Sequence, residues 1–309
     1  MCVEIAIATF NGERYLSDQI QSILSQDYSD WRLLIRDDGS TDSTHKILQA
    51  FLQQEPRRLQ WLNPVESQNI GVVCNFNRLL EYSSSNYTFL CDQDDVWLPS
   101  KIKDSLQIIK QMEYQWGVET PILVHSDLHV VTAKLQLFHA SFWRSHNLDP
   151  TRNTLRDLLV RNNITGCTVV INKALRKLAL PIPNSIFMHD WWLALVATAF
   201  GKIAWLSKPT ILYRQHQRNQ VSAQSQKLRY LVTRLQQPRR IREYYRKTQK
   251  QAQEFFNRYG SQLSAQDKEI VSAYCECENL GFCAKRQLLI RHKLFDIGLV
   301  RNLALLSLI

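Results

Sequence analysis

Short apolar runs alternate with segments of helical periodicity over the first 91 residues, and this alternation constrains the fold more than any other feature of the sequence. The runs cover residues 3–9, 31–36, 59–62 and 87–91. The segments between them place apolar residues three and four positions apart, which is the spacing of one helix face. Strands that alternate with helices form a mostly parallel sheet with helices on both faces. We therefore predict an α/β fold with a Rossmann-like sheet flanked by helices.

Polar turns follow three of the four runs. They are Asn11-Gly12, residues 37–44 and residues 92–95. In open α/β sheets, ligands bind beyond the carboxyl ends of the strands, so we expect these turns to share one edge and to form the functional site. No Gly-x-Gly-x-x-Gly follows the first run, which argues against a dinucleotide-dependent dehydrogenase.

Three carboxylates occupy four consecutive positions directly after the run at 87–91. They are Asp92, Asp94 and Asp95. Carboxylates this close repel one another unless a cation lies among them, and hard oxygen ligands suit Mg²⁺ or Mn²⁺. The cluster therefore predicts a divalent metal site. The alternative is a solvated acidic turn, since aspartate is common after strands.

A second enzyme class fits the same stretch. Asp92, Asp94 and Val96 match the Asp-x-Asp-x-Val pattern of phosphatases that form an aspartyl phosphate, with Asp92 as nucleophile and Asp94 as acid. Those enzymes usually carry the motif on their first strand, whereas three strand-like runs precede it here. A phosphatase or phosphotransferase remains the alternative function, and a non-catalytic nucleotide-binding protein is a further one.

The second half of the chain has a less regular pattern. We expect strands at 122–125, 168–171 and 202–205, with helices at 154–160 and 190–200. Residues 217–226 are polar and predict a loop. From residue 227 the chain is basic and has helical periodicity. This change divides the sequence into a domain at 1–224 and a basic, mainly helical extension at 225–309.

The basic charge of the chain is concentrated in that extension. Of the 38 Lys and Arg residues, 16 lie in 225–309 against seven Asp and Glu, and the net charge of the whole chain is +10. A basic segment favours phosphate-rich partners, but this one carries no recognisable nucleic-acid-binding module. We therefore predict no nucleic-acid partner. The start of the chain lacks the pattern of a secretory signal, so we expect a cytoplasmic protein.

Four segments of the first domain resemble the family 2 glycosyltransferases of the GT-A fold. The segments are Ile7–Leu16, Ile35–Asp42, Asn69–Asn77 and Asp92-Gln93-Asp94, and the resemblance runs from Ile5 to about Ser222. It implies a GT-A type mixed sheet and a nucleotide-sugar donor. It also implies which side chains bind the donor nucleotide: Thr9, Asn11, Glu13, Asp37, Asp38 and Asn69.

Two later segments resemble the acceptor side of that family. In Met188–Trp192 the family's usual Glu-Asp pair reads His189-Asp190, so the resemblance assigns the general base to Asp190. The alternative for Asp190 is a helix N-cap. Leu212–His216 resembles a stretch of rhamnosyltransferase-like members. There the resemblance makes His216 a metal ligand or a phosphate contact, beside Asp92 and Asp94.

The resemblance implies an inverting, metal-dependent glycosyltransferase of cell-surface polysaccharide synthesis. The donor it suggests is dTDP-L-rhamnose, and the acceptor is a glycan or a lipid-linked glycan. Four residues near the motifs are candidates for contact with the donor or acceptor sugar: Asp95, Trp97, Trp191 and Trp192.

The end of the chain, residues 288–309, is amphipathic and too charged to span a bilayer. We expect it to lie on an anionic membrane as a peripheral contact on the inner face. The alternative is that its apolar residues pack on the catalytic domain or on a second subunit.

Overall fold

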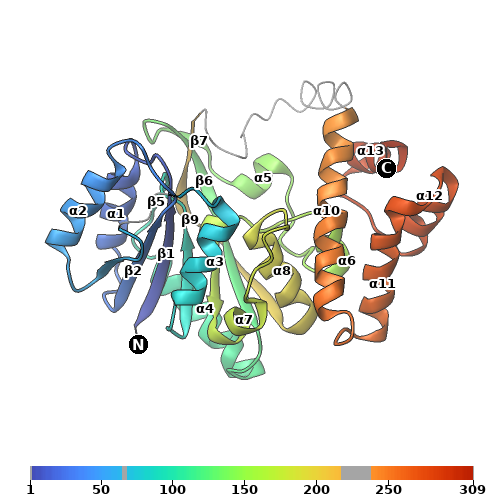
Figure 1. The fold of residues 1–309 in the computed structure, drawn as a ribbon, viewed down its shortest axis with the longest axis horizontal. Helices are drawn as coiled ribbons and strands as arrows, with labels where there is room; N and C mark the ends of the chain where they lie inside the picture. The colour runs from blue at the N-terminus through green and yellow to red at the C-terminus, as the bar shows by residue number, and fades with distance from the viewer. Residues whose placement is uncertain (1, 65–67, 217–237, 309) are drawn as a thin grey trace.

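The computed structural model describes residues 2–64, 68–216 and 238–308, and in this part of the chain one large mixed sheet organises the fold (Figure 1). The strand order is β3-β2-β1-β4-β8-β6-β9-β5, with β7 paired to β6. Four neighbours in this order are parallel: β1 (Val3–Thr9), β2 (Trp31–Asp37), β3 (Leu59–Trp61) and β4 (Tyr87–Cys91). These are the four runs from which an α/β fold was predicted, and the prediction is confirmed.

The parallel strands are buried on both faces. Ala6, Leu34 and Leu90 contribute to one hydrophobic cluster, while their sequence neighbours Ile5 and Phe89 contribute to a second. Successive side chains of a strand point to opposite faces, so a strand covered on both sides is apolar throughout. The sheet is therefore the middle layer between two cores.

Helices close both cores. The first cluster includes side chains of α3 (Val72–Tyr82), α6 (Leu155–Val160), α7 (Lys173–Ala179) and α8 (His189–Phe200). The second includes side chains of α1 (Leu16–Leu24), α2 (Thr44–Gln54), α4 (Lys101–Trp116) and α5 (Phe142–His146). Helix α4 lies outside the predicted elements, although Ile102, Leu106 and Ile109 form a buried stripe at helical spacing.

The second half of the sheet is mixed. Strand β8 (Val170–Asn172) is antiparallel to both β4 and β6 (Ile122–Thr132), and β9 (Lys202–Gln215) is parallel to β6. Strand β8 begins later than predicted because Gly166–Thr168 form a 3₁₀ turn, η1. Strands β6 and β9 are much longer than predicted, and β9 also pairs with the short β5 (Val96–Trp97). Strand β7 (Leu137–His139) returns on β6 as a hairpin.

Four α-helices follow residue 237 in the described part of the chain: α10 (Pro238–Tyr259), α11 (Ala265–Glu276), α12 (Phe282–Arg291) and α13 (Leu299–Leu308), with the 3₁₀ turn η2 (Cys277–Asn279). Their buried residues join the core that holds Trp192 of α8, and they include Tyr245, Phe255 and Leu305. The extension is helical where described, as predicted. The loop predicted at 217–226 lies outside the described residues, and the domain boundary at 224 stays a prediction.

The apolar end of the chain is partly core. Leu294 and Leu305 are fully buried, whereas Leu303 is 57% exposed. No helix that the structure describes is long and apolar enough to cross a membrane. At least two apolar residues between 288 and 309 therefore pack on the protein, as the alternative to membrane contact expected.

Buried His125 of β6 should make folding stability depend on pH. Burial lowers the pKa of its imidazole to about 3, and neither ring nitrogen has a hydrogen-bond partner among the described residues. The pKa of His125 in the folded protein lies below its value of about 6.5 in the unfolded chain. The neutral imidazole therefore contributes its full stability to the fold above pH ~6.5, and this stability is lost as the pH falls toward 3. Between pH 6.5 and pH 5 the loss is about 2 kcal/mol.

Urea unfolding at pH 7 and at pH 5 measures this contribution. We expect His125→Leu to lose about 2 kcal/mol less between the two pH values than the wild-type protein loses. An equal loss in both proteins would show that the proton is taken up elsewhere.

Candidate active site

A pocket of about 1160 Å³ opens where the strands β1 and β4 end, between the first turns of α3 and α8 and the end of β9. The polar turns predicted to share one edge do so. Nine of the predicted site residues line this pocket: Thr9, Asn11, Glu13, Asp38, Asn69, Asp92, Asp94, Asp190 and His216. Five do not: Asp37, Asp95, Trp97, Trp191 and Trp192.

Asp37 is a structural residue. It is fully buried, and its carboxylate accepts hydrogen bonds from the backbone of Ser40 at 2.8 Å and from the hydroxyl of Thr9 at 2.7 Å. Burial alone would raise the pKa of Asp37, but these hydrogen bonds and one with His45 outweigh it and hold the pKa below its ordinary value. The prediction that Asp37 contacts the nucleotide is wrong, because its oxygens face inward and are already satisfied.

Asp37 and Asp38 were both predicted to bind the nucleotide, and only Asp38 lines the pocket. Its two oxygens accept the backbone N–H groups of Ile70 at 2.8 Å and Gly71 at 2.9 Å. The bonds join the end of β2 to the start of α3. Gly71 has φ = 82°, a left-handed conformation that favours glycine. Asp38 therefore fixes the turn that presents Asn69 to the pocket.

The turn after β1 is fastened to the turn after β2. The Asn11 side chain accepts from the Thr41 backbone at 2.8 Å, and the Glu13 carboxylate accepts from the Ser43 backbone at 3.0 Å. Asn11 and Glu13, which were predicted to bind the nucleotide, therefore also connect the turn after β1 to the turn after β2. Glu13 is exposed, so its other carboxylate oxygen can reach a ligand.

Gln93 connects the acidic loop to the turn after β1, and the sequence did not single it out. Its side-chain amide pairs with the backbone of Phe10 in both directions, accepting at 2.9 Å and donating at 2.8 Å. A Cβ on Gly12 would lie 2.3 Å from the Gln93 amide oxygen, so only glycine allows this approach. The position of Gln93 between two predicted metal ligands was the available signal.

Asp92, Asp94 and His216 line the same pocket, and His216 contacts Asp94 although it lies over 120 residues further along the chain. The His216 ring is 2.8 Å from the Asp94 carboxylate and stacks on Tyr15 at 5.0 Å. Burial, together with the charges of Asp94 and Asp190, raises the pKa of Asp92 to about 7. A divalent cation would relieve this repulsion, and two carboxylates with an imidazole suit Mn²⁺ or Mg²⁺. The residues present therefore fit the predicted metal.

Arg214 of β9 anchors the acidic loop and was not predicted as a site residue. Its guanidinium donates to the Asp94 backbone carbonyl at 3.0 Å, to the Ala133 carbonyl at 2.9 Å and to the Asp18 carboxylate at 2.8 Å. The side chain is almost fully buried and packs over the Tyr15 ring. It therefore holds the acidic loop, β9 and the β6–β7 hairpin in one arrangement.

Asp95 and Trp97 lie beneath the acidic loop instead of in the pocket. Asp95 is fully buried and accepts the Arg214 backbone N–H at 3.1 Å. The Trp97 ring is 2% exposed and lies 4.8 Å from the ammonium of buried Lys101. The predicted sugar contacts of these two residues are wrong, because neither side chain reaches the pocket.

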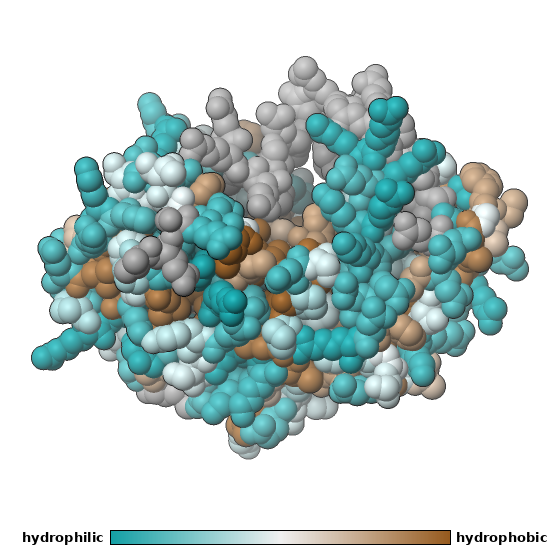
Figure 2. Space-filling model, in the orientation of Figure 1, coloured by the Kyte–Doolittle hydropathy of each residue, from teal (hydrophilic) through white to brown (hydrophobic). Residues whose placement is uncertain are grey.

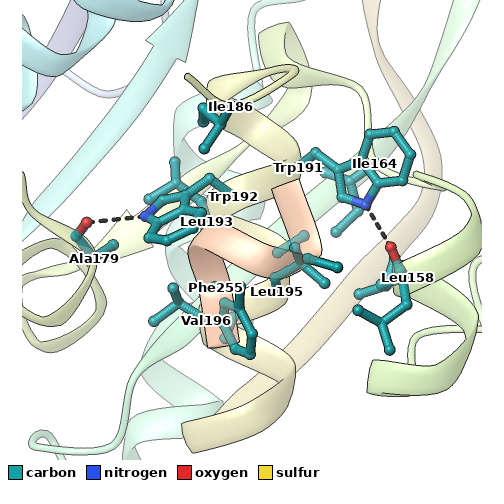
Figure 3. Packing of buried hydrophobic residues seen from close by; sticks show 14 of the residues in the cluster. Leu158, Ile164, Ala179, Ile186, Trp191, Trp192, Leu193, Leu195, Val196 and Phe255 are labelled. Atoms are coloured by element: carbon teal, nitrogen blue, oxygen red, sulfur yellow. Dashed lines mark hydrogen bonds between the residues drawn. The ribbon is translucent and has the colours of Figure 1, made fainter. Parts of the chain in front are cut away.

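Trp191 and Trp192 are core residues of α8 (Figure 3). They are 2% and 0% exposed, and their indole N–H groups donate to the Leu158 and Ala179 carbonyls at 2.5 and 3.0 Å. The predicted contact of these rings with a sugar is wrong, since a stacking ring needs an open face. They instead hold α8, and with it Asp190, against the helices on either side.

Asp190 stands in the first turn of α8 at the floor of the pocket. The N-cap of that helix is Met188, so the alternative of Asp190 as N-cap is wrong. Burial raises the pKa of Asp190 to about 6, against hydrogen bonds from the backbone of Trp191 and Gly166. A carboxyl group with this pKa is ionised at neutral pH yet basic enough to take a proton.

His189 and Gly166 shape the surroundings of Asp190. The His189 ring is stacked on Phe76 at 3.9 Å between centroids, and burial lowers its pKa to about 3. A neutral imidazole beside Asp190 leaves the carboxylate as the base. A Cβ on Gly166 would come within 3.3 Å of the Asp190 carboxylate, which shows how closely the 3₁₀ turn covers it.

Comparison with known proteins identifies the family of the chain. Residues 4–179 match the model of glycosyl transferase family 2. The chain is 32% identical over 229 residues to the dTDP-rhamnosyl transferase RfbG of Shigella flexneri, covering 70% of this chain and 74% of that protein. A second relative is a putative teichuronic acid biosynthesis glycosyltransferase, TuaG of Bacillus subtilis. It is 26% identical over 201 residues, which are 64% of this chain and 73% of TuaG.

Other similar proteins are longer. The chain spans 59% of three uncharacterised mycobacterial relatives, at 29% identity over 69% of its own length.

Solved structures support the fold. A Pyrobaculum calidifontis mannosyltransferase in complex with GDP-Man and Mn²⁺ aligns with a TM-score of 0.59 at 14% identity, over 99% of this chain and 78% of that one. S. aureus TarS in complex with UDP-GlcNAc aligns with a TM-score of 0.53 at 15% identity, over 99% of this chain and 90% of that one. The mixed sheet flanked by helices is thus the GT-A arrangement. The chain belongs to glycosyl transferase family 2.

Proposed function

We propose that this glycosyltransferase moves a sugar, with L-rhamnose from dTDP-L-rhamnose as the candidate donor, to a hydroxyl of a glycan or lipid-linked glycan, with inversion and with Mg²⁺ or Mn²⁺. One observation carries the proposal: the carboxylates fitted to a metal, the base and the turns assigned to the nucleotide line a single pocket. The rhamnosyl relative suggests the donor.

The roles of the residues follow from their positions. Asp92, Asp94 and His216 would hold the cation, whose charge would stabilise a departing diphosphate. Asp38, Asn11 and Asn69 border the part of the pocket assigned to the nucleoside. Gln93 and Arg214 keep the acidic loop in place through their backbone contacts.

The chemical step requires one proton transfer by the protein. The Asp190 carboxylate accepts the proton of the acceptor hydroxyl as that oxygen forms a bond to the anomeric carbon. The bond from that carbon to the diphosphate breaks on the opposite face, and the nucleoside diphosphate leaves with the bonding pair. One displacement inverts the anomeric centre, and no bond between sugar and protein forms.

A panel of nucleotide sugars tests the proposal. Purified protein with Mn²⁺ and a rhamnan or lipid-linked acceptor should release dTDP from dTDP-L-rhamnose, and EDTA should stop the release. Phosphate release together with a trapped aspartyl phosphate at Asp92 would support the phosphatase instead. Turnover of another nucleotide sugar alone would correct the donor and leave the reaction class unchanged.

The contact between Gly12 and Gln93 gives a prediction on donor binding. Gly12→Ala should weaken donor binding about tenfold, because the new Cβ would displace the Gln93 amide from the Phe10 backbone. Gln93→Ala removes the same pairing, so the double variant should bind the donor no more weakly than either single variant. Calorimetric titration of the four proteins measures this coupling. Additive losses would mean that the two residues act separately.

A further inference from the structure

Two exposed elements adjoin residues that line the pocket, and they differ in character. The first is the tip of the β6–β7 hairpin, which comprises Lys134, Leu135, Leu137 and Phe138. Its apolar side chains are 37%, 63% and 56% exposed in the order of the chain. Exposed apolar side chains that lie together on a surface often mark a site of interaction with a protein or a membrane.

The second element is the basic ridge of α10. Its six exposed cationic side chains are Arg239, Arg240, Arg242, Arg246, Lys247 and Lys250, against the single acidic residue Glu243 in the same stretch. The opposite face of the helix, with Ile241 and Tyr245, is buried in the core. The ridge is therefore fixed on the surface by its apolar face. Figure 2 shows hydrophilic residues along the outer side of this helix.

Both elements are joined to residues that line the pocket. Ala133, at the base of the hairpin tip, lines the pocket and is held by Arg214. Met188 lines the other side, and its neighbour Phe187 donates a backbone hydrogen bond to Gln251 of α10 at 3.0 Å. The Lys247 ammonium lies 5.5 Å from the Phe187 ring. The hairpin and the ridge are therefore each attached next to a residue that lines the pocket.

The two elements also rise from the same side of the molecule. Strand β7 and the first turns of α10 lie at the upper edge of Figure 1, toward which the parallel strands run, whereas the N-terminus and α7 lie at the lower edge. A surface with apolar side chains at one end and cations at the other matches the interface of an anionic bilayer, where apolar groups enter the acyl boundary and Lys and Arg meet the lipid phosphates.

We propose that the hairpin tip and the basic ridge together form the surface by which the enzyme docks on an anionic membrane, with the pocket facing the lipid. This inference rests on the proposed function in one respect: an acceptor carried on a lipid explains why the enzyme would bind a membrane. It relocates the membrane contact from residues 288–309, where Leu294 and Leu305 are core, to two elements at the pocket.

Sedimentation with liposomes tests the surface without requiring turnover. Wild-type protein should bind vesicles of phosphatidylglycerol and phosphatidylethanolamine, should not bind phosphatidylcholine vesicles, and should be released as salt rises. Each Lys or Arg near an anionic leaflet contributes about fivefold in partitioning. The triple variant Arg239→Gln, Arg240→Gln, Lys247→Gln should therefore bind on the order of 100-fold more weakly.

The hairpin is tested separately from the charges. Leu137→Ser with Phe138→Ser should weaken binding roughly tenfold, because two partly exposed apolar side chains lose their burial in the acyl boundary. A matched control removes three exposed charges that belong to neither element: Arg57→Gln, which precedes β3, and Lys173→Gln and Lys177→Gln in α7. The control should bind vesicles within about twofold of the wild-type protein.

Donor turnover with a soluble acceptor separates this inference from the proposed function. All variants should retain wild-type turnover on that acceptor, since none of the substituted residues lines the pocket. Equal loss of vesicle binding in the control and ridge variants would overturn the docking surface, and so would binding that ignores lipid charge. Normal vesicle binding by a protein that turns over no nucleotide sugar would contradict the function and leave the surface standing.

Discussion

Asp190→Asn should lower the rate of sugar transfer by about 10²–10⁴-fold while donor affinity stays within about twofold of the wild-type value. The amide has nearly the same shape as the carboxylate and cannot take the acceptor proton. Steady-state transfer rates and calorimetric donor titration give the two quantities. Asp149→Asn, which changes an exposed carboxylate outside the pocket, is the matched control and should change neither.

The pH profile of transfer gives a second readout of the same residue. Burial raises the pKa of Asp190 to about 6, and only the ionised form is a base. The rate should therefore fall about tenfold per pH unit below pH ~6 and level off above it. The residual rate of Asp190→Asn should not show this fall below pH ~6. Equal losses of donor affinity and transfer rate in Asp190→Asn would instead indicate a structural role.

Asp92→Asn and Asp94→Asn should each abolish metal-dependent turnover, by about 10³-fold or more, without destabilising the metal-free protein. Electrostatic stabilisation of a leaving group is often the largest single catalytic contribution. Asp94→Asn removes a charge that raises the pKa of Asp92, and Asp92→Asn removes the buried carboxyl group itself. Thermal unfolding in EDTA should give a midpoint no lower than that of the wild-type protein.

The change in thermal midpoint on adding metal shows whether Asp92 and Asp94 bind the ion or only lie near its site. Saturating Mn²⁺ at 100 times its dissociation constant contributes about 2.7 kcal/mol to the folded state, so the wild-type midpoint should rise by several degrees. The two variants should show little or no rise. A full rise in both would place the metal ligands elsewhere in the chain.

The parallel half of the fold was predictable because its signal is local. Strands β1 to β4 are apolar runs bounded by polar turns, and the helices between them are amphipathic at short range. The mixed half depends on pairing between distant segments. Strand β8 is only three residues long and joins β4 to β6 through antiparallel contacts that no local pattern encodes. Its place in the sheet therefore needed the three-dimensional arrangement.

The site was predictable to the extent that its residues terminate strands. Asp92 and Asp94 were predicted from the carboxylates that follow a strand, and Asp38 was predicted from the resemblance to the glycosyltransferase family. The sequence could not tell Asp37 from Asp38, since neighbouring side chains at a strand end face opposite ways, and Asp37 faces inward. Local sequence did not identify Arg214, because it acts on the acidic loop from a strand that is distant in sequence.

The tryptophans of α8 show a limit of a different kind. Proximity to Asp190 in sequence suggested that Trp191 and Trp192 contact a sugar, as though α8 had an exposed face. The first nine residues of that helix are all buried, because α3 and α7 lie on one side and α6 and α10 on others. A helix that is apolar all round is a core helix. The composition of α8 was the available signal.

The configuration of the transferred sugar tests the central claim most directly. Nuclear magnetic resonance of the product made from dTDP-L-rhamnose, or from whichever donor the panel identifies, reports the anomeric configuration at the new bond. A single displacement with Asp190 as base requires the configuration opposite to that of the donor. Retention of the donor configuration, or a trapped bond between the sugar and a side chain of the pocket, would contradict it.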